Sequence, residues 1–407
     1  MEKVKNAIIV SDFGTIEGGA TKVAHKTAIA LNKQGINVVL FCAVAPVSEE
    51  LKGSGVDVVC LGQSDILNEK SKIKGVLRGI SNKLAKKEFK KLLLRFNPQD
   101  TVIHVHNWTK GISSSIFPVA KKLKFKTFIT VHDYFLICPN GGLFNYPKKE
   151  ICDIKPMSIK CIRCNCDSRS YLQKLFRVLR QRKQNKNIRK FKDIGYIFIS
   201  DFSKREFLRR YDKIQNQHFL LNSIDFDENR YRVACENNDT YLFIGSLTEV
   251  KGIRQFCEAV SKAKVKGVVV GQGVLSEELK QAYPEIEFVG WKSKEEMLEY
   301  YNRARCLIFS SIWYETMGLA PLEVLAYGIP VICSNLNSAT DFVIDGQNGL
   351  IYDGRSIDSL VEAIGTAEQG VKELSENAFN EFDSEKYSER KYIEDLLNIY
   401  NFGRVVT

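Results

Sequence analysis

The chain has 407 residues, 44% of them hydrophobic and 26% charged, and its formal net charge is +11. This length favours two domains over a single core, and the ordinary hydrophobic content excludes a mainly disordered chain. There is no apolar run long enough to cross a bilayer, no secretion-signal pattern at the N-terminus, and an odd number of cysteines, 11. These features argue against a membrane-spanning or secreted, disulfide-built protein, so we expect a cytoplasmic one.

Positive charge is concentrated in the first half of the chain. Residues 1–222 contain 41 Lys and Arg against 18 Asp and Glu, whereas residues 223–407 contain 18 against 30. A strongly basic half is typical of proteins that bind nucleic acid, an anionic membrane surface or an acidic substrate. Since no RNA- or DNA-binding motif is visible, we expect no nucleic-acid partner.

Both halves alternate apolar strands with helical patterns. A helix is predicted over Thr21–Gln34, after the first strand, and it ends at Gly35. Repeated βα units predict two doubly wound parallel sheets. The expected strands are Ala7–Val10, Val38–Phe41, Val56–Leu61, Thr101–Val105, Thr127–Val131, Tyr196–Ser200, Leu242–Ile244, Gly267–Val270, Ile286–Val289, Cys306–Phe309 and Val331–Cys333.

A glycine pair, Gly18 and Gly19, lies between the first strand and the first helix. Glycines here let the backbone approach a diphosphate closely, and the N-terminus of the next helix favours negative charge. The spacing matches neither a dinucleotide-binding fingerprint nor a Walker loop. A glycine-rich turn also occurs here for structural reasons alone, so both interpretations stay open.

Two stretches, Lys70–Arg95 and Tyr171–Lys192, combine apolar residues at helical spacing with many basic residues. Such a face is usually no more than a solvated surface. Because basic amphipathic helices also bind anionic membranes, we expect peripheral association with the inner face of the membrane. The residues expected to contribute are Arg177, Arg180, Arg182 and Lys183.

Polar residues follow two neighbouring predicted strands. His106 and Asn107 come after Thr101–Val105, and His132 comes at the end of Thr127–Val131. Ligands of open α/β sheets bind at the carboxyl ends of the strands, so these residues are expected to open onto one cleft. The alternative for a single histidine is a hydrogen-bonded structural role.

Five cysteines cluster between residues 138 and 166. Cys161 and Cys164 have the close spacing of a metal knuckle, and Cys138 and Cys152 would complete four ligands of a structural zinc. Disulfides are rare in cytosolic proteins, so the alternative is a loop with free thiols.

Glu315 and Glu323 flank a small-residue loop that contains Gly318 and Leu319. A strand precedes this segment and a helix follows it, so backbone N–H groups would point at an anion while the carboxylates bind neutral hydroxyls. Together these features suit a nucleotide sugar, although two solvated glutamates are the simpler interpretation.

A second polar turn, with Ser246 and Lys251, also lies between a strand and a helix. Lys251 offers a point charge for phosphate oxygens, although an isolated lysine is more often solvated.

In this context the Glu315–Glu323 segment, the glycine pair and His132 resemble the retaining GT-B glycosyltransferases, specifically glycosyltransferase family 4, also called glycosyl transferases group 1. The resemblance covers most of the chain and implies two Rossmann-like doubly wound domains that face a cleft. The corresponding division is an acceptor-side domain over 1–222 with a cysteine-containing insertion at about 138–190, a linker over 223–239, a nucleotide-sugar domain over 240–387 and a helix over 388–407 that returns to the first domain.

The resemblance further implies transfer of a sugar from a nucleotide-diphosphate sugar to a lipid-linked or saccharide acceptor, with retention of configuration and without a required metal. His132 and Glu315 would be the catalytic residues, while His106 and Asn107 would lie on the acceptor side. The donor would be held by Gly18, Gly19, Ser246, Lys251, Gly318, Leu319 and Glu323.

Ser246 departs from the family pattern, because an Arg commonly stands there. The absence of an arginine at this position removes one cation from the expected diphosphate site. This favours the alternative that the protein is a non-catalytic, membrane-associated partner protein that binds a sugar nucleotide. A sugar-nucleotide epimerase of the same fold is the second alternative.

Overall fold

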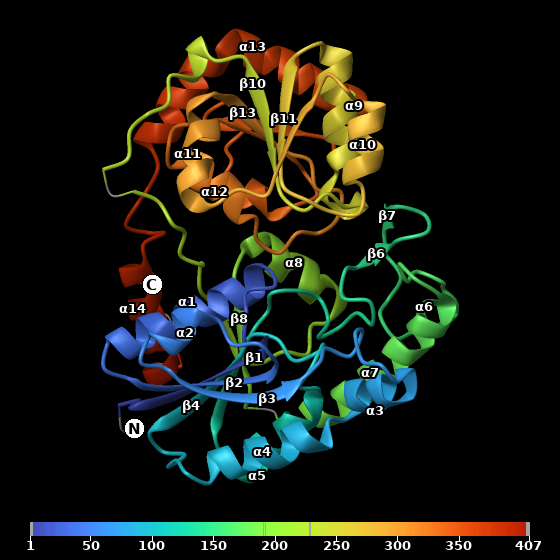
Figure 1. The fold of residues 1–407 in the computed structure, drawn as a ribbon, viewed down its shortest axis with the longest axis vertical. Coiled ribbons are helices and arrows are strands. Elements are labelled where there is room, and N and C mark those ends of the chain that lie inside the picture. Colours follow the sequence, from blue (N-terminus) through green and yellow to red (C-terminus); the bar gives the residue numbers. More distant parts are fainter. Residues whose placement is uncertain (1–2, 190, 192, 228, 404–407) are drawn as a thin grey trace.

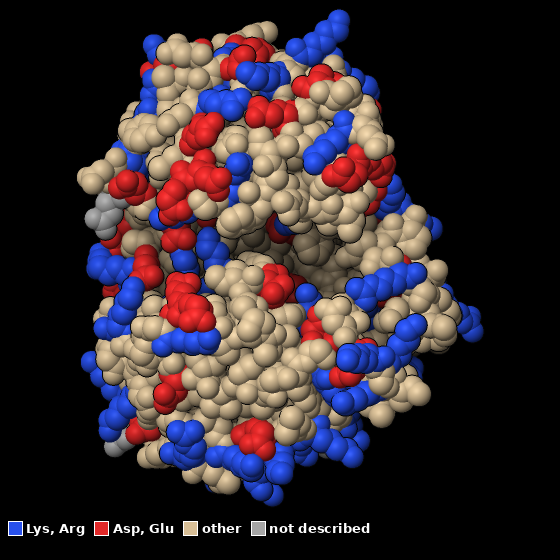
Figure 2. All heavy atoms as spheres, viewed as in Figure 1, with Lys and Arg blue, Asp and Glu red and all other residues tan. Residues whose placement is uncertain are grey.

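The protein forms two α/β domains, one above the other along the long axis of the molecule (Figure 1). This computed structural model describes residues 3–189, 191, 193–227 and 229–403. The space-filling view shows a hollow between the two domains (Figure 2).

The N-terminal domain is built on a seven-stranded parallel sheet in the order β3-β2-β1-β4-β5-β8-β9. Its central strands are almost entirely buried because helices cover both faces, which is the pattern expected of a parallel sheet. The strands are β1 (Asn6–Phe13), β2 (Asn37–Val44), β3 (Asp57–Gln63), β4 (Thr101–Val105), β5 (Lys126–Thr130), β8 (Gly195–Phe198) and β9 (Gln217–Phe219).

The N-terminal domain also holds the helices of the basic half. They are α1 (Gly19–Lys33), α2 (Glu49–Lys52), α3 (Lys72–Ile80), α4 (Lys83–Leu93), α5 (Phe117–Lys122), α6 (Ile159–Arg163), α7 (Tyr171–Ile188) and α8 (Asp201–Arg210), with a short 3-10 helix at Ser114–Ile116. A small antiparallel pair, β6 (Phe144–Asn145) and β7 (Glu150–Ile151), lies in the cysteine-containing insertion.

The basic stretch Lys70–Arg95 is two helices, α3 and α4, and not one continuous helix. The break falls at Asn82, which is buried and whose side chain accepts the backbone N–H of Ala85 and donates to the carbonyl of Gly111. The side chain therefore starts a new helix, as N-cap asparagines do. The other basic stretch forms α7, and its predicted end at residues 190 and 192 lies outside the described residues.

The C-terminal domain contains a six-stranded parallel sheet in the order β12-β11-β10-β13-β14-β15. Its strands are β10 (Thr240–Ile244), β11 (Lys266–Val270), β12 (Glu287–Gly290), β13 (Ala304–Phe309), β14 (Val331–Ser334) and β15 (Gly349–Tyr352). Its helices are α9 (Ile253–Ala263), α10 (Ser276–Ala282), α11 (Lys294–Asn302), α12 (Leu319–Leu325) and α13 (Ile357–Asn380), with 3-10 turns at Cys235–Asn237, Glu249–Lys251 and Ser338–Asp341.

The last helix, α14 (Glu389–Phe402), lies beside α1 of the N-terminal domain although it follows the C-terminal domain in sequence (Figure 1). Leu396 and Ile399 are fully buried in a cluster with apolar residues of β1, β2 and α1. Tyr400 places its hydroxyl 2.7 Å from Nδ1 of His104 in β4. The helix therefore packs the C-terminal end of the chain against the N-terminal domain. Residues 404–407, which the sequence analysis included in this helix, lie outside the described residues.

Candidate functional site

The neighbouring positions of β4 and β5 bring two predicted site residues into contact. β4 ends at Val105 and β5 at Thr130, so His106 and His132 leave the sheet at the same carboxyl edge. Nδ1 of His106 lies 2.9 Å from Nε2 of His132, and the two rings stack. These residues line a small pocket with Trp108, Asp133 and other residues of the two loops.

Burial keeps these histidines neutral. It lowers the pKa of His132 to about 3 and that of His104, whose ring lies 4.2 Å from the ring of His106, also to about 3. His106 has its pKa lowered for the same reason, and its Nε2 has no hydrogen-bond partner among the described residues. Asp133, in the same pocket, has its pKa raised by burial to about 6.

Asn107 occupies the expected strand edge, but its side chain has a structural role. Its Oδ1 accepts the backbone N–H of Asp12 at 2.5 Å and lies 3.4 Å from Oγ of Ser11. Asp12 in turn accepts the backbone N–H groups of Lys110, Gly111 and Ile112. Asn107 and Asp12 therefore fix the loop after β4, which carries His106.

The carboxylate of Glu315 is surrounded by donors from its own domain. Nζ of Lys251 lies 2.8 and 2.7 Å from its two oxygens, and Ser311 Oγ and Trp313 Nε1 each lie 3.1 Å from Oε2. Only 10% of the side chain of Glu315 is exposed. The two residues assigned to the sugar and to the diphosphate thus form one ion pair at the floor of the cleft.

A glycine sets the approach of the Lys251 turn to the Glu315 loop. Gly252 has a φ of 70°, and a Cβ there would lie 1.8 Å from the carbonyl oxygen of Ser310. Any other residue would push the turn away from β13 and separate Lys251 from Glu315. Ser246, at the start of the same turn, is exposed.

The loop before α12 differs in part from the predicted anion site. The backbone N–H of Gly318 donates to Oγ of Ser338 at 3.2 Å, so this amide already has a partner. Gly318 is instead required by Phe309, because a Cβ there would lie 2.6 Å from the phenyl ring. Leu319 begins α12, and no side chain among the described residues caps this end of the helix.

Glu323 faces the N-terminal domain across the cleft. Its carboxylate lies 3.8 Å from Nζ of Lys22 in α1, and Lys22 also pairs with Asp225 of the linker at 3.3 Å. Burial raises the pKa of Glu323, while the charge of Lys22 opposes that shift.

The N-terminus of α1 reaches the same region through Gly18 and Gly19. A Cβ at either glycine would meet no atom within 4 Å, so the turn borders open space. Thr316, next to Glu315, donates its hydroxyl to the carbonyl of His132 at 2.7 Å. The predicted residues of both domains are thereby brought to one cleft.

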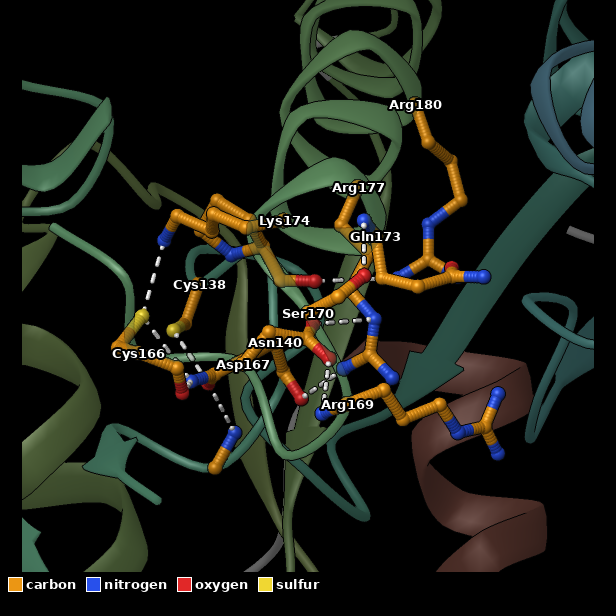
Figure 3. Close-up of polar contacts among 12 residues, drawn as sticks. Cys138, Asn140, Cys166, Asp167, Arg169, Ser170, Gln173, Lys174, Arg177 and Arg180 are labelled. Carbon is orange, nitrogen blue, oxygen red and sulfur yellow. Dashed lines mark hydrogen bonds and ion pairs between the residues drawn. The ribbon is translucent and has the colours of Figure 1, made fainter. Parts of the chain in front are cut away.

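The cysteine cluster is organised around a lysine. Lys174 of α7 is fully buried, and its Nζ lies 3.1 Å from Sγ of Cys166 (Figure 3). The same Nζ lies 3.6 Å from Sγ of Cys161. Cys166, which was not among the four predicted ligands, is buried here, whereas Cys164 is partly exposed. Within the described residues no group of three or more His, Cys, Asp or Glu side chains is arranged to hold a metal.

The prediction that Arg177 and Arg180 contact a membrane is wrong, because their side chains make contacts inside the N-terminal domain. Arg177 pairs with the buried carboxylate of Asp167 at 3.0 Å (Figure 3). Arg180 is buried and donates to the carbonyls of Thr109 and Pro139. Arg182 and Lys183 are exposed, as a surface role requires.

Sequence reasoning did not identify Lys22, Asp133 and Trp313 as site residues. Asp133 directly follows His132, and Trp313 stands two residues before Glu315, so proximity to a predicted residue was a usable signal for both. Lys22 stands three residues after Gly19, but its contact with Glu323 depends on how the domains face each other and is not visible in the sequence.

Comparison with solved structures identifies the class of fold. Sucrose-phosphate synthase from Thermosynechococcus elongatus superposes with a TM-score of 0.69 at 17% identity, over 97% of this chain and 98% of that one. Anabaena HepE in complex with UDP-glucose gives 0.68 at 13% identity, over 97% and 99%. Two Rossmann-like domains facing a cleft, together with these neighbours, confirm the predicted GT-B fold.

The sequence comparisons concern mainly the C-terminal domain. Residues 225–380 match the family model described as Glycosyl transferases group 1, so the chain carries a domain of that kind. An uncharacterized 42.6 kDa protein in the cps region of Klebsiella pneumoniae is 25% identical over 72% of this chain and 74% of its own length. O-antigen chain mannosyltransferase C of Escherichia coli is 24% identical over 47% of this chain and 56% of its own.

For most of these relatives only about half of the length is matched, as for a second cps-region protein of Klebsiella pneumoniae, of which 52% is covered. The matched family segment contains Lys251, Glu315 and Glu323, whereas His106 and His132 lie outside it.

Proposed function

We propose that the protein is a glycosyltransferase that moves a sugar from a nucleotide-diphosphate sugar to an acceptor hydroxyl. The observation that carries this proposal is the Lys251–Glu315 ion pair within a glycosyl transferases group 1 domain, opposite the neutral His132. The Anabaena structural neighbour with UDP-glucose bound supports a donor of this chemical class.

In the proposed reaction the bond between the anomeric carbon and the diphosphate breaks as the acceptor oxygen bonds to the same carbon. The configuration is retained, so the acceptor approaches from the face that the diphosphate leaves, and its proton passes to the diphosphate. Negative charge grows on the diphosphate, and preorganised donors stabilise it. Lys251, the Leu319 amide and the Gly18–Gly19 turn supply these donors, and no metal ion is required for the step.

Glu315 binds hydroxyls of the donor sugar and Glu323 binds those of the ribose. The ammonium of Lys251 contacts both oxygens of Glu315. When this ammonium turns to the phosphates, Oε1 of Glu315 becomes free for a sugar hydroxyl, whereas Ser311 and Trp313 still donate to Oε2. His132 offers a neutral ring to the sugar or the β-phosphate, while His106 fixes its orientation from the acceptor side.

We further propose a lipid-linked saccharide acceptor and work at the inner, cytoplasmic face of a membrane. Exposed apolar side chains gather on the basic helices: Ile73 and Leu77 of α3 are 75% and 63% exposed, and Leu172 of α7 is 77% exposed. α3 and α7 contact each other, so these exposed residues lie on neighbouring helices. Figure 2 shows Lys and Arg side chains along the lower and lower-right edges of this domain. Apolar and basic residues on one face favour binding to anionic lipid. In the described part of the chain, none of the helices is long and apolar enough to span a bilayer.

Nucleotide release from a panel of nucleotide-diphosphate sugars, with and without a lipid-linked acceptor, tests the enzyme assignment. A transferase releases nucleotide diphosphate faster when the acceptor is added, and the sugar appears on the acceptor. Release without any acceptor dependence would indicate the epimerase, and donor binding without release would indicate the partner protein.

Membrane association is tested by sedimentation with vesicles. The protein should bind anionic vesicles at low salt, release at high salt and ignore neutral ones. Replacing Arg182 and Lys183 with glutamine should weaken binding without changing nucleotide affinity, because both side chains are exposed and far along the chain from the donor residues. Equal, negligible binding to both vesicle types would favour a soluble acceptor.

A further inference from the structure

A groove of about 620 Å³ lies on the N-terminal domain, outside the residues assigned to the donor. Its walls come from the insertion (Asp153–Met157), the C-terminal end of α7, the end of α8 and the loop after His132. A volume of this size is within the range of small-molecule sites.

Three basic side chains of the groove form no ion pair within the described residues. Lys155, Arg189 and Lys213 line it, and within the described residues their side chains have no hydrogen-bond or ion-pair partner. One unpaired carboxylate, Asp212, lies among them. Unpaired cations around a concave site attract an anion.

A buried arginine at the groove is only partly satisfied. Arg210 has 6% of its side chain exposed and pairs with Glu206 and Asp153 through its terminal nitrogens. Its Nε has no partner in the described part of the chain. Arg210 therefore adds a positive charge to the wall of the groove, although Glu206 and Asp153 already pair with it.

Part of the remaining lining of the groove is apolar. Leu136, Pro156 and Met157 contribute to its walls. Leu136 also lines the small pocket of His106 and His132, so the groove borders the acceptor side of the proposed site. Asn185 and Arg189 come from the C-terminal end of α7, whose exposed Leu172 near the other end belongs to the proposed membrane face.

We propose that this groove binds the phosphate or diphosphate of a lipid-linked acceptor, with the cations around the phosphate and the first part of the apolar chain against Leu136, Pro156 and Met157. This deepens the proposed function and depends on it, since it names the part of the acceptor that the groove holds. The chemical class of the ligand is a phosphate or diphosphate ester of an apolar alcohol.

Calorimetric titration of the full chain with farnesyl diphosphate is the direct test. Lys155→Glu with Lys213→Glu should weaken this binding by at least about tenfold, because two attractive charges become repulsive. The matched control, Lys86→Glu with Lys87→Glu, reverses two exposed charges on α4 and should leave the affinity within about twofold, since distant exposed charges are screened. Lys251→Met should also leave it unchanged, because the diphosphate is not held in the donor cleft.

Other probes separate the source of the phosphate. Inorganic diphosphate and dihexanoyl phosphatidylglycerol should both bind more weakly than farnesyl diphosphate. The inference is overturned by equal affinity for inorganic diphosphate, by equal affinity for the phospholipid, by no detectable binding of farnesyl diphosphate, or by unchanged affinity in the Lys155 and Lys213 double variant.

Donor turnover is followed in the same preparations. If nucleotide is released normally from the donor but one of the contradicting binding results is found, only the assignment of the groove is refuted. Absence of donor turnover with every nucleotide sugar removes the proposed function, whatever the groove binds.

Discussion

Replacing Glu315 with glutamine separates a sugar-binding role from a purely structural one. The carboxylate accepts from Lys251, Ser311 and Trp313, and glutamine keeps only one acceptor oxygen and no charge. A hydrogen bond to a charged group is worth about 1.5–3 kcal/mol, but Lys251 is 25% exposed and can be solvated in the variant. We therefore expect a loss of about 1–2 kcal/mol in the stability of the C-terminal domain, which leaves it folded.

Turnover should fall by at least about tenfold, which corresponds to about 1.4 kcal/mol of transition-state stabilisation. The assay is nucleotide release at saturating donor, with circular dichroism to confirm folding. Glu278→Gln is the matched control, because Glu278 pairs with Arg254 on the surface and should not affect turnover. Near-normal turnover in well-folded Glu315→Gln protein would refute the assignment.

A double-mutant cycle with Lys251→Met decides how Glu315 acts. If Glu315 binds sugar hydroxyls itself, Glu315→Gln lowers turnover again in the Lys251→Met background. If it only positions Lys251, the second substitution has no further effect, since neighbouring residues that act as a unit are not additive. The second result would contradict our assignment of Glu315 to the sugar.

Three further outcomes are expected. Burial sets the pKa of His104 and of His132 at about 3 against an ordinary value of 6.5, so their stabilising effect is complete above pH 6.5 and declines as the pH falls towards 3. His106, whose pKa is also lowered by burial, adds to this loss of stability, whereas Asp133, with its pKa raised to about 6, opposes it between pH 6 and 4, so stability should still fall as the pH drops. Unfolding of the N-terminal domain by urea at several pH values measures the loss, and equal stability at pH 7 and 5 would contradict neutral histidines. Zinc binding by the four cysteines named from the sequence stays a prediction, and anaerobically prepared protein should carry close to one zinc per chain. Binding requires the ammonium of Lys174 to move away from the sulfur atoms that it contacts. Metal-free protein in elemental analysis would leave only the interpretation as free thiols. Leu396→Ala should destabilise the N-terminal domain by about 2–5 kcal/mol, because this fully buried side chain fixes α14; an unchanged urea midpoint would show that the helix is dispensable.

The sequence by itself determined the parallel sheets and pointed to the segment that carries Glu315 and Glu323. Buried parallel strands are continuous apolar runs, so strands such as Thr101–Val105 can be identified locally, and their order of βα units implies the doubly wound form. Two short edge strands, β9 (Gln217–Phe219) and β15 (Gly349–Tyr352), were not among the predicted strands, although the edge strand β12 was. The segment with Glu315 and Glu323 is contiguous, so its residue types and spacing are visible without a structure.

Only the tertiary structure decided which side chains contact each other across long stretches of sequence. The contact of His106 with His132 follows from the pairing of β4 with β5, and that of Lys22 with Glu323 follows from how the two domains face each other. A helical pattern likewise does not tell which basic residues are buried. Arg177 and Lys174 have the same charge in the sequence as Arg182. They are nevertheless held inside, Arg177 by Asp167 and Lys174 by the thiols of Cys166 in the preceding loop and Cys161 in α6.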